Sequence, residues 1–408
     1  MLIASFFRDI RANFAPIFGL ALVPIMGFIG TAVDYSRGNA LKVAMQAALD
    51  STGLMLSKDA TGLTPEQMKA KATAHFMALF NQPEARDIDL TAVLSTPQAG
   101  SFKLDISAKA KLDARFLRVF GQNHFEVGSA TQVVWGIKRL ELALALDNTG
   151  SMSSNSKMTE LKKAAKSLLD ILKLAAKKEG DVKVSIVPFD TTVKIGKSHK
   201  DADWLDFSVK GIAKDDWDGC VIDRSYPNDT NDATPDGSSA KKFPASQCGD
   251  DIVRALPLTD IYTGLTTLKN KVDNMQPNGF TNVTIGLMWG WHTLTNSVPF
   301  EQGAASQPDL DKVIILLTDG DNTRAWDNIG NKEITSESAI NLRTEAACAN
   351  VKAANIRIYT IRVIDGNSTL LKNCASSPTM YYDVQNASQL SGVFTSIAQN
   401  LANLRIAK

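Results

Sequence analysis

The longest uninterrupted run of hydrophobic positions lies near the N-terminus, where residues 14–33 carry no charged side chain. Twenty apolar residues in a helix match the roughly 30 Å hydrocarbon core of a bilayer, so the run predicts a transmembrane helix after a short cytoplasmic segment, residues 1–13. A cleaved signal peptide is the alternative, because Gly30-Thr31-Ala32 has the small-residue pattern of a cleavage site. The run is longer than the apolar region of about 7–15 residues that signal peptides carry, which favours a retained anchor.

After the apolar run, the spacing of hydrophobic positions predicts a small mixed unit over residues 34–137. Apolar and alanine positions at helical spacing continue to about Lys58, so one long helix is expected to leave the membrane. Thr64-Pro65 predicts a second helix, with Thr as its N-cap and Pro at its first position. Three alternating stretches near residues 88–94, 102–108 and 125–135 then predict strands. A helix followed by a small antiparallel sheet is the plan of an α+β pilin-like module.

From residue 138 onward the pattern changes to fully apolar strands that alternate with amphipathic helices. The expected strands are 142–146, 182–189, 313–317 and 356–363, and the expected helices include 157–178, 334–354 and 387–402. Continuous apolar strands are covered on both faces, and alternation of strands with helices is typical of a doubly wound parallel sheet. We therefore predict an α/β fold for residues 138–408, in which ligands bind at the carboxyl ends of the strands.

Charge changes this picture in one place. The 408 residues carry a formal net charge of +1, which excludes a dedicated nucleic-acid binder, because such proteins have a clear basic excess. Residues 196–260 nevertheless contain 13 acidic and 8 basic side chains, a net charge of −5. This acidic insertion is longer than a simple strand-to-helix connection requires. It is either a solvated loop or a surface that recognises a partner.

The four cysteines fall into two local pairs, Cys220 with Cys248 and Cys348 with Cys374. Neither pair has the spacing of a zinc site, so two disulfides in an oxidising compartment are the expected arrangement, with four buried thiols as the alternative. Disulfides together with the apolar run predict a single-pass membrane protein with an exported body. The bacterial inner membrane as its location, with the body in the periplasm, is what the second family resemblance below implies.

Acidic and hydroxyl side chains follow two predicted strands and precede one predicted helix. Asp147, Thr149 and Ser151 come after the first strand of the α/β region, Asp319 follows a later strand, and Thr281 lies between them. Strand ends of one parallel sheet converge, and hard oxygen donors suit Mg²⁺ or Mn²⁺. The alternative is that Asp147 caps a helix and Asp319 lies in a turn.

Asp147-x-Thr149-x-Ser151 resembles the DxSxS signature of von Willebrand factor A (vWA) domains, with Thr in place of the first Ser. Thr281 in Gly-Phe-Thr-Asn is similar to the threonine loop of that family, and Asp319 in Leu-Leu-Thr-Asp-Gly to its second aspartate. The resemblance covers about residues 139–405 and implies a metal-ion-dependent adhesion site. By this resemblance, the hydroxyls of Thr149, Ser151 and Thr281 would bind the metal. Asp147 and Asp319 would bind it directly or through water.

The N-terminal region is similar to the TadE/TadG group of membrane-anchored proteins of Tad (Flp) pilus assembly. The similarity rests on residues 11–15 before the apolar run, on residues 32–37 after it and on the alanine-rich helix that follows. An anchor of this kind joined to a C-terminal vWA domain is the TadG-like arrangement. It implies pilus assembly or pilin-like proteins as partners.

These observations predict a binding protein and not an enzyme. The leading hypothesis is a membrane-anchored factor of pilus assembly or adhesion that binds an acidic group of a partner through its metal. A metal-independent scaffold is the second hypothesis. A Mg²⁺-dependent hydrolase is the third, and it lacks a nucleophile or general base with supporting spacing.

Overall fold

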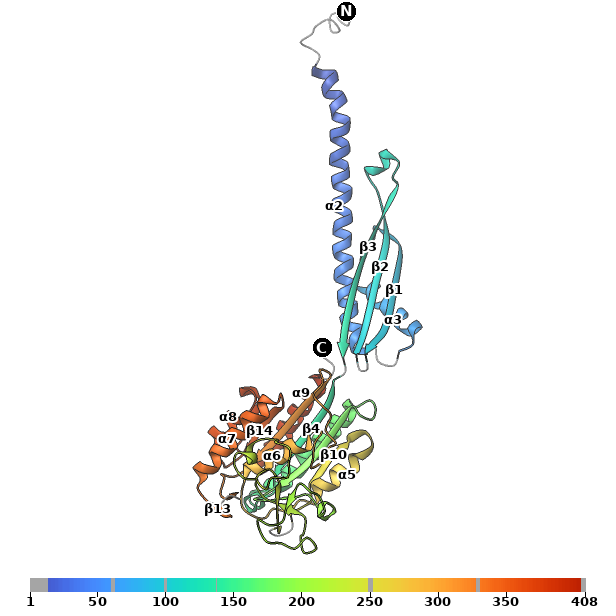
Figure 1. The fold of residues 1–408 in the computed structure, drawn as a ribbon. Helices are drawn as coiled ribbons and strands as arrows, with labels where there is room; N and C mark the ends of the chain where they lie inside the picture. The colour runs from blue at the N-terminus through green and yellow to red at the C-terminus, as the bar shows by residue number, and fades with distance from the viewer. Residues whose placement is uncertain are drawn as a thin grey trace, which may run out of the picture. The chain divides into compact units, whose positions relative to one another are not determined.

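The computed structural model describes residues 14–59, 63–98, 101–136, 138–248, 252–327 and 331–404, and contacts divide the chain into two units with the boundary after Gly136 (Figure 1). The described residues of the N-terminal unit form two helices and a three-stranded antiparallel sheet in the order β1-β2-β3. Its elements are α2 (Phe14–Asp59), α3 (Pro65–Leu79), β1 (Ala85–Gln98), β2 (Ser101–Asp113), the 3-10 turn η2 (Leu117–Phe120) and β3 (His124–Gly136).

Helix α2 is continuous over 46 residues, which confirms the predicted single long helix, and its length and composition would allow it to cross a membrane. Its C-terminal half packs against the sheet through glycines. A Cβ atom added to Gly38 would lie 2.6 Å from the ring of Phe125, and one added to Gly53 would lie 2.5 Å from Val133. The absence of side chains at these positions therefore allows the helix and the sheet to approach closely.

The C-terminal unit is built on a six-stranded sheet in the order β10-β5-β4-β11-β14-β15. Its strands are β4 (Arg139–Asp147), β5 (Val182–Phe189), β10 (Leu256–Asp260), β11 (Leu310–Thr318), β14 (Arg357–Val363) and β15 (Tyr381–Val384). Neighbouring strands are parallel except at one edge, where β10 runs antiparallel to β5. The expectation of a wholly parallel sheet is wrong at this edge. The chain leaves β5 at its carboxyl end and returns from the insertion at that same end, so β10 enters the sheet in the opposite direction.

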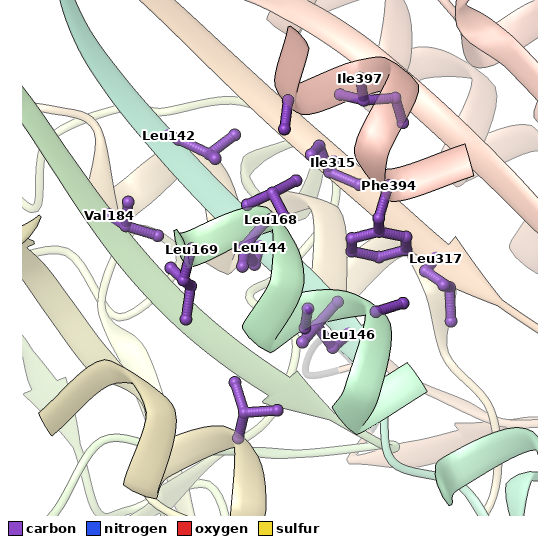
Figure 2. Close-up of a cluster of buried hydrophobic side chains, with 14 of the residues drawn as sticks. Leu142, Leu144, Leu146, Leu168, Leu169, Val184, Ile315, Leu317, Phe394 and Ile397 are labelled. Carbon is purple, nitrogen blue, oxygen red and sulfur yellow. The ribbon is translucent and has the colours of Figure 1, made fainter. Parts of the chain in front are cut away.

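Helices cover both faces of this sheet, which confirms the doubly wound α/β fold. One face packs against α4 (Lys157–Ala175), α5 (Ile261–Asp273) and α9 (Leu390–Leu404), and the other against α6 (Val283–Thr293), α7 (Glu337–Ala353) and α8 (Ser368–Cys374). Along β4, Leu142, Leu144 and Leu146 point toward α4 and α9 (Figure 2), because successive side chains of a strand alternate between faces. Ala143 and Ala145 point the other way.

Those two alanines make room for α6, the most deeply placed helix of the unit. Every residue of α6 is buried, and a Cβ added to Gly290 would lie 3.6 Å from Ala145. A helix that is apolar on all sides must be covered on all sides. The sheet covers one side, and aromatic side chains of the insertion cover another, with the ring of Phe243 tilted against that of Trp289 at 5.1 Å between centroids.

The acidic insertion is folded, so its interpretation as a solvated loop is wrong. Three short strands of the insertion pair with β6, which precedes it, in a small sheet of order β6-β8-β9-β7. Trp217 and Phe243, the first residue of β9, are buried. The short elements of this unit are η3 (Gly150–Ser153), β6 (Val193–Lys194), η4 (Lys197–His199), β7 (Leu205–Asp206), β8 (Cys220–Val221), η5 (Asn228–Thr230), β9 (Phe243–Ser246), β12 (Ala325–Asp327), β13 (Lys332–Ile334), η6 (Pro378–Met380) and η7 (Ala387–Gln389).

Both predicted disulfides are present and use all four cysteines of the chain. Cys220–Cys248 closes the insertion, and Cys348–Cys374 joins α7 to the end of α8 on one face of the sheet.

Removing the Cys348–Cys374 bond should destabilise the C-terminal unit without changing its fold. Because the bond closes a loop of 26 residues, the loop-entropy relation predicts a loss of about 3–4 kcal/mol of unfolding free energy in the double variant Cys348→Ala/Cys374→Ala. Urea unfolding followed by tryptophan fluorescence measures this loss. A decrease below about 1 kcal/mol would contradict the prediction and show that the closed loop is already restricted in the unfolded chain.

Candidate metal centre

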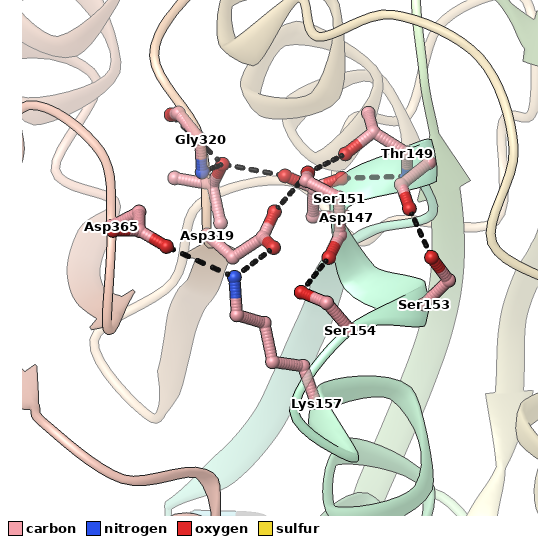
Figure 3. A network of polar contacts seen from close by, with 11 residues as sticks. Asp147, Thr149, Ser151, Ser153, Ser154, Lys157, Asp319, Gly320 and Asp365 are labelled. Atoms are coloured by element: carbon pink, nitrogen blue, oxygen red, sulfur yellow. Dashed lines mark hydrogen bonds and ion pairs between the residues drawn. The ribbon is translucent and has the colours of Figure 1, made fainter.

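The five predicted site residues come from three segments that meet at the carboxyl edge of the sheet. Figure 3 shows four of them, Asp147, Thr149, Ser151 and Asp319. Asp147 is the last residue of β4, and Asp319 follows the last residue of the neighbouring strand β11. Thr281 lies in the loop that precedes α6. Parallel neighbours end at the same edge, so the two aspartates are brought together although they are far apart in the sequence.

The loop after β4 is organised around the Asp147 carboxylate, which is completely buried. One of its oxygens accepts the backbone N–H of Thr149 at 2.8 Å, and the other accepts the hydroxyl of Thr318 at 2.5 Å. The Thr149 and Ser151 hydroxyls then lie 3.0 Å apart on the same side of this loop. The carboxylate thus holds the hydroxyl-bearing loop in place.

Asp319 is the second carboxylate, and a lysine neutralises it. The Ser151 hydroxyl donates to Oδ1 of Asp319 at 2.6 Å, while the Lys157 ammonium donates to Oδ2 at 2.7 Å. Both charged side chains are almost fully buried. Lys157 also reaches the exposed carboxylate of Asp365, in the loop after β14, at 3.2 Å (Figure 3).

Thr281 faces the same space from the other side. A Cβ atom added to Gly320 would stand 3.2 Å from the Thr281 hydroxyl and 3.7 Å from that of Ser151. The missing side chain at Gly320 therefore leaves a small cradle between two hydroxyls. The Thr281 backbone is held by Thr323, whose hydroxyl accepts its N–H at 2.9 Å.

The charges in this cluster perturb one another. Burial raises the pKa of Asp147, and the neighbouring charge of Asp319 raises it further, because desolvation and a second negative charge both disfavour ionisation. Burial alone would lower the pKa of Lys157, but its hydrogen bonds to Asp319 and Asp365 outweigh burial, so this pKa is raised. A cation is thus favoured at this edge of the sheet.

The donor set fits a small divalent metal. Two carboxylates and three hydroxyls are hard oxygen donors, which Mg²⁺ and Mn²⁺ prefer, and the Gly320 cradle leaves room beside two of the hydroxyls. The residues that could hold the ion are those expected from the sequence, namely Asp147, Thr149, Ser151, Thr281 and Asp319.

Sequence reasoning missed Lys157, although its spacing carried a signal. Leu161, Leu168 and Leu172 form the buried face of α4, and residue 157 lies on that face one turn earlier. A lysine on an otherwise apolar face requires a buried acidic partner. Sequence reasoning also missed Thr318, which orients Asp147.

The insertion contacts this centre through a second layer of buried polar groups. Asn282, which caps α6 and follows Thr281, donates to the Asp223 carboxylate at 2.7 Å, and the Trp326 backbone N–H donates to the same oxygen at 2.9 Å. Asp229, also in the insertion, accepts from Arg343 of α7 at 2.8 Å. The insertion therefore supports the loop that presents Thr281.

A second group of potential metal ligands, Asp218 with Cys220 and Cys248, does not qualify. Its ligand atoms lie within 4.8 Å of one another, but the two sulfurs are joined in a disulfide and offer no thiolate.

The fold and this site define the class of the C-terminal unit. Residues 235–396 match the family model of the von Willebrand factor type A domain. The match includes Thr281 and Asp319 but begins inside the insertion, so it leaves out Asp147, Thr149 and Ser151. The structure places those three residues on the central strand β4 and the turn after it, beside Asp319.

The N-terminal unit contains a second match. Residues 12–55 match the family model described as putative Flp pilus-assembly TadE/G-like. The chain therefore combines a TadE/G-like segment with a vWA domain and is a Tad pilus-associated vWA protein. No curated protein sequence matches the chain.

Solved structures with partial similarity to the chain include two pilus proteins and a mussel byssus protein. The pilus adhesin SpaC from Lactobacillus rhamnosus GG, in its open conformation, is 13% identical with a TM-score of 0.41, over 80% of this chain and 35% of that one. The vWF domain of the type V pili tip protein Mfa5 from Porphyromonas gingivalis is 11% identical with a TM-score of 0.43, over 67% and 98%. Proximal thread matrix protein 1 from the mussel byssus, solved with a zinc-occupied MIDAS motif, is 15% identical with a TM-score of 0.38, over 65% and 48%. At these scores no function is inferred from the similarity.

The buried Asp223 should make stability depend on pH. Burial raises the pKa of Asp223 to about 7, whereas an unfolded aspartate titrates near about 3.9. Between these values the folded protein holds a proton that the unfolded chain has released, so unfolding free energy falls as pH rises, by up to about 1.4 kcal/mol per pH unit. Asp223→Asn should flatten this fall, because one amide oxygen can accept both hydrogen bonds described above.

Urea unfolding between pH 4.5 and 7.5 in the presence of a chelator measures this dependence. Asp236→Asn is the matched control in the same insertion. Hydrogen bonds from Lys241 and Ser238 lower the pKa of Asp236, so it is ionised in both states over this range. An equal change of slope in both variants would contradict the role of Asp223.

Proposed function

We propose that this chain is an inner-membrane protein of Tad-type pilus assembly or adhesion that binds an acidic group of a partner through a divalent metal. The observation that carries the proposal is the meeting of Asp147, Thr149, Ser151, Thr281 and Asp319 at one edge of the sheet. Helix α2 would anchor the protein through residues 14–33, and the body would lie in the periplasm, where its two disulfides are stable.

The chemistry of the site supports binding and not turnover. A metal held largely by neutral hydroxyls keeps much of its positive charge and attracts a further carboxylate ligand. The Lys157 ammonium reduces the negative charge of Asp319, so the protein neutralises the metal only in part. An Asp or Glu side chain of a pilin-like partner would then complete the coordination of Mg²⁺ or Mn²⁺.

Lys157 also supports one alternative. An ammonium at 2.7 Å from Asp319 is itself a cation at the site, and it would satisfy that carboxylate in a scaffold that binds no metal. The two functions differ in a single measurable property, the response of the folded protein to divalent metal.

Mg²⁺ or Mn²⁺ should raise the melting temperature of the full chain, and Thr281→Val should abolish the effect. The variant keeps the shape of the side chain and removes one proposed ligand. A metal present at about 100 times its dissociation constant stabilises the native state by about 2.7 kcal/mol. Thermal unfolding and titration calorimetry, each with and without chelator, measure the effect.

Thr284→Val is the matched control. This threonine is buried three residues further on in α6, where its hydroxyl contacts that of Thr344 at 2.8 Å, away from the site. It should retain the metal response. A wild-type chain that gives neither a thermal shift nor binding heat would reject the metal proposal and favour the scaffold.

Capture of partners should depend on metal in the same way. Full-length chain bound to a resin should enrich a pilin-like or pilus-assembly protein from solubilised membranes, because the partner carboxylate needs the metal. Chelator or Thr281→Val should remove that protein, and Thr284→Val should not. Enrichment that survives both chelator and Thr281→Val would contradict metal-dependent recognition and leave the scaffold role.

A further inference from the structure

The turn between β2 and β3 reaches the part of α2 that is expected to lie in the membrane. This turn, residues 114–123, is here named the hairpin tip and contains η2. A Cβ added to Gly30 would lie 2.5 Å from Cβ of Phe116, and one added to Gly27 would lie 2.8 Å from the ring of Phe120. Both glycines fall within the apolar run 14–33. At 1.5 Å per residue, Gly27 lies about 9 Å inside the end of that run at Val33.

Three large apolar side chains of the hairpin tip are exposed, beside the exposed polar side chains of Arg115, Arg118, Gln122 and Asn123. Val119 is 83% exposed, Phe120 63% and Phe116 43%. Exposed apolar side chains of α2, including Phe28 and Ile29, lie at the same level of the helix. The tip therefore extends the apolar surface of the helix sideways. In water this patch would be unfavourable, because burying apolar surface away from water lowers the free energy and this surface is left exposed.

One carboxylate fixes the hairpin tip to the helix. Asp34, fully buried on α2, accepts the backbone N–H groups of three consecutive residues, Arg115 at 3.0 Å and Phe116 and Leu117 at 2.8 Å each. Further along the tip, the N–H groups of Val119, Gly121 and Gln122 bond to carbonyls of the same turn. Backbone groups that are already paired can approach lipid at little cost.

Charged side chains mark the opposite boundary of the patch. Arg37 binds both Asp34, at 3.3 Å, and Glu84, at 2.6 Å, and Arg115 binds Glu84 at 3.1 Å. Arg115, at the start of the tip, takes part in these ion pairs. Phe116, Val119 and Phe120 follow it along the tip, with the exposed Arg118 between them. A change from ionic to apolar surface over one or two helical turns is typical of a membrane–water interface.

We propose that the hairpin tip inserts into the lipid interface beside α2, so that the N-terminal unit holds the membrane at two points. The proposal rests on the membrane anchoring proposed above. Its occupant is the bilayer, because the patch is continuous with the apolar surface of the helix that would span it. Asp34 acts as a positioning residue, since it sets the depth of the tip without contacting lipid.

The depth of the tip can be measured with a single label. Because all four native cysteines are in disulfides, a Val119→Cys variant has one free thiol for an environment-sensitive fluorophore. The full chain is reconstituted in phosphatidylcholine–phosphatidylglycerol nanodiscs, and the label is quenched with lipids that carry a nitroxide near the headgroup. We expect strong quenching and blue-shifted emission.

Two further labels separate the inference from the anchoring on which it rests. Leu22→Cys reports the span, and Val93→Cys, exposed on β1, reports water. Quenching at position 22 without quenching at 119 would overturn insertion of the tip while leaving the anchor intact, and would assign the patch to a protein partner. Absence of quenching at both positions would overturn the anchoring itself.

A second variant tests the role of Asp34. Asp34→Asn removes the charge that binds the three N–H groups, so quenching at position 119 should fall while quenching at position 22 stays unchanged. Unchanged quenching at 119 would overturn Asp34 as the positioning residue. Circular dichroism of the same samples verifies that the N-terminal unit remains folded.

Discussion

The buried pair formed by Lys157 and Asp319 is the interaction on which the candidate metal centre depends. Each charge would be very unfavourable alone in the interior, and each is stable only because the other lies 2.7 Å away. The pair joins the first turn of α4 to the end of β11, and Ser151 adds the loop after β4 by binding the other oxygen of Asp319. Three segments are thus held together by one carboxylate. The Ser151 hydroxyl, which faces the cradle, owes its position to this arrangement.

The insertion also relies on buried charged groups that are paired. A segment with 13 acidic residues would normally stay in solvent, yet Asp223 and Asp229 are buried and paired with Asn282, Trp326 and Arg343. These contacts support the threonine loop from behind, while Phe243 covers α6. The insertion is therefore part of the structure that supports the centre. Its exposed aspartates contribute negative charge to the surface that a partner would meet.

Much of this organisation could be predicted from the sequence because it follows from periodicity and strong local signals. The continuous helix α2, the Thr64 cap, the strands β4, β5, β11 and β14 and the disulfide pairs all follow from such patterns. The approach of Asp147 to Asp319 followed from the rule that parallel strands end at one edge. The antiparallel direction of β10 and the burial of Asp223 could not be predicted. Both depend on how the insertion folds back onto the sheet, and no local sequence pattern determines that. The assignment of metal to the five residues stays a proposal.

The route of the chain between β5 and β10 has a consequence for the order of folding. Ser151 and Asp319 are 168 residues apart in sequence, and the insertion with its disulfide lies between them. Contacts between such distant residues form late, because closing a long loop costs entropy that only many other contacts can offset. The centre therefore assembles after most of the unit has folded. A partner that requires the assembled centre would ignore chains that are still incomplete, so recognition at this edge would also act as a test of maturity.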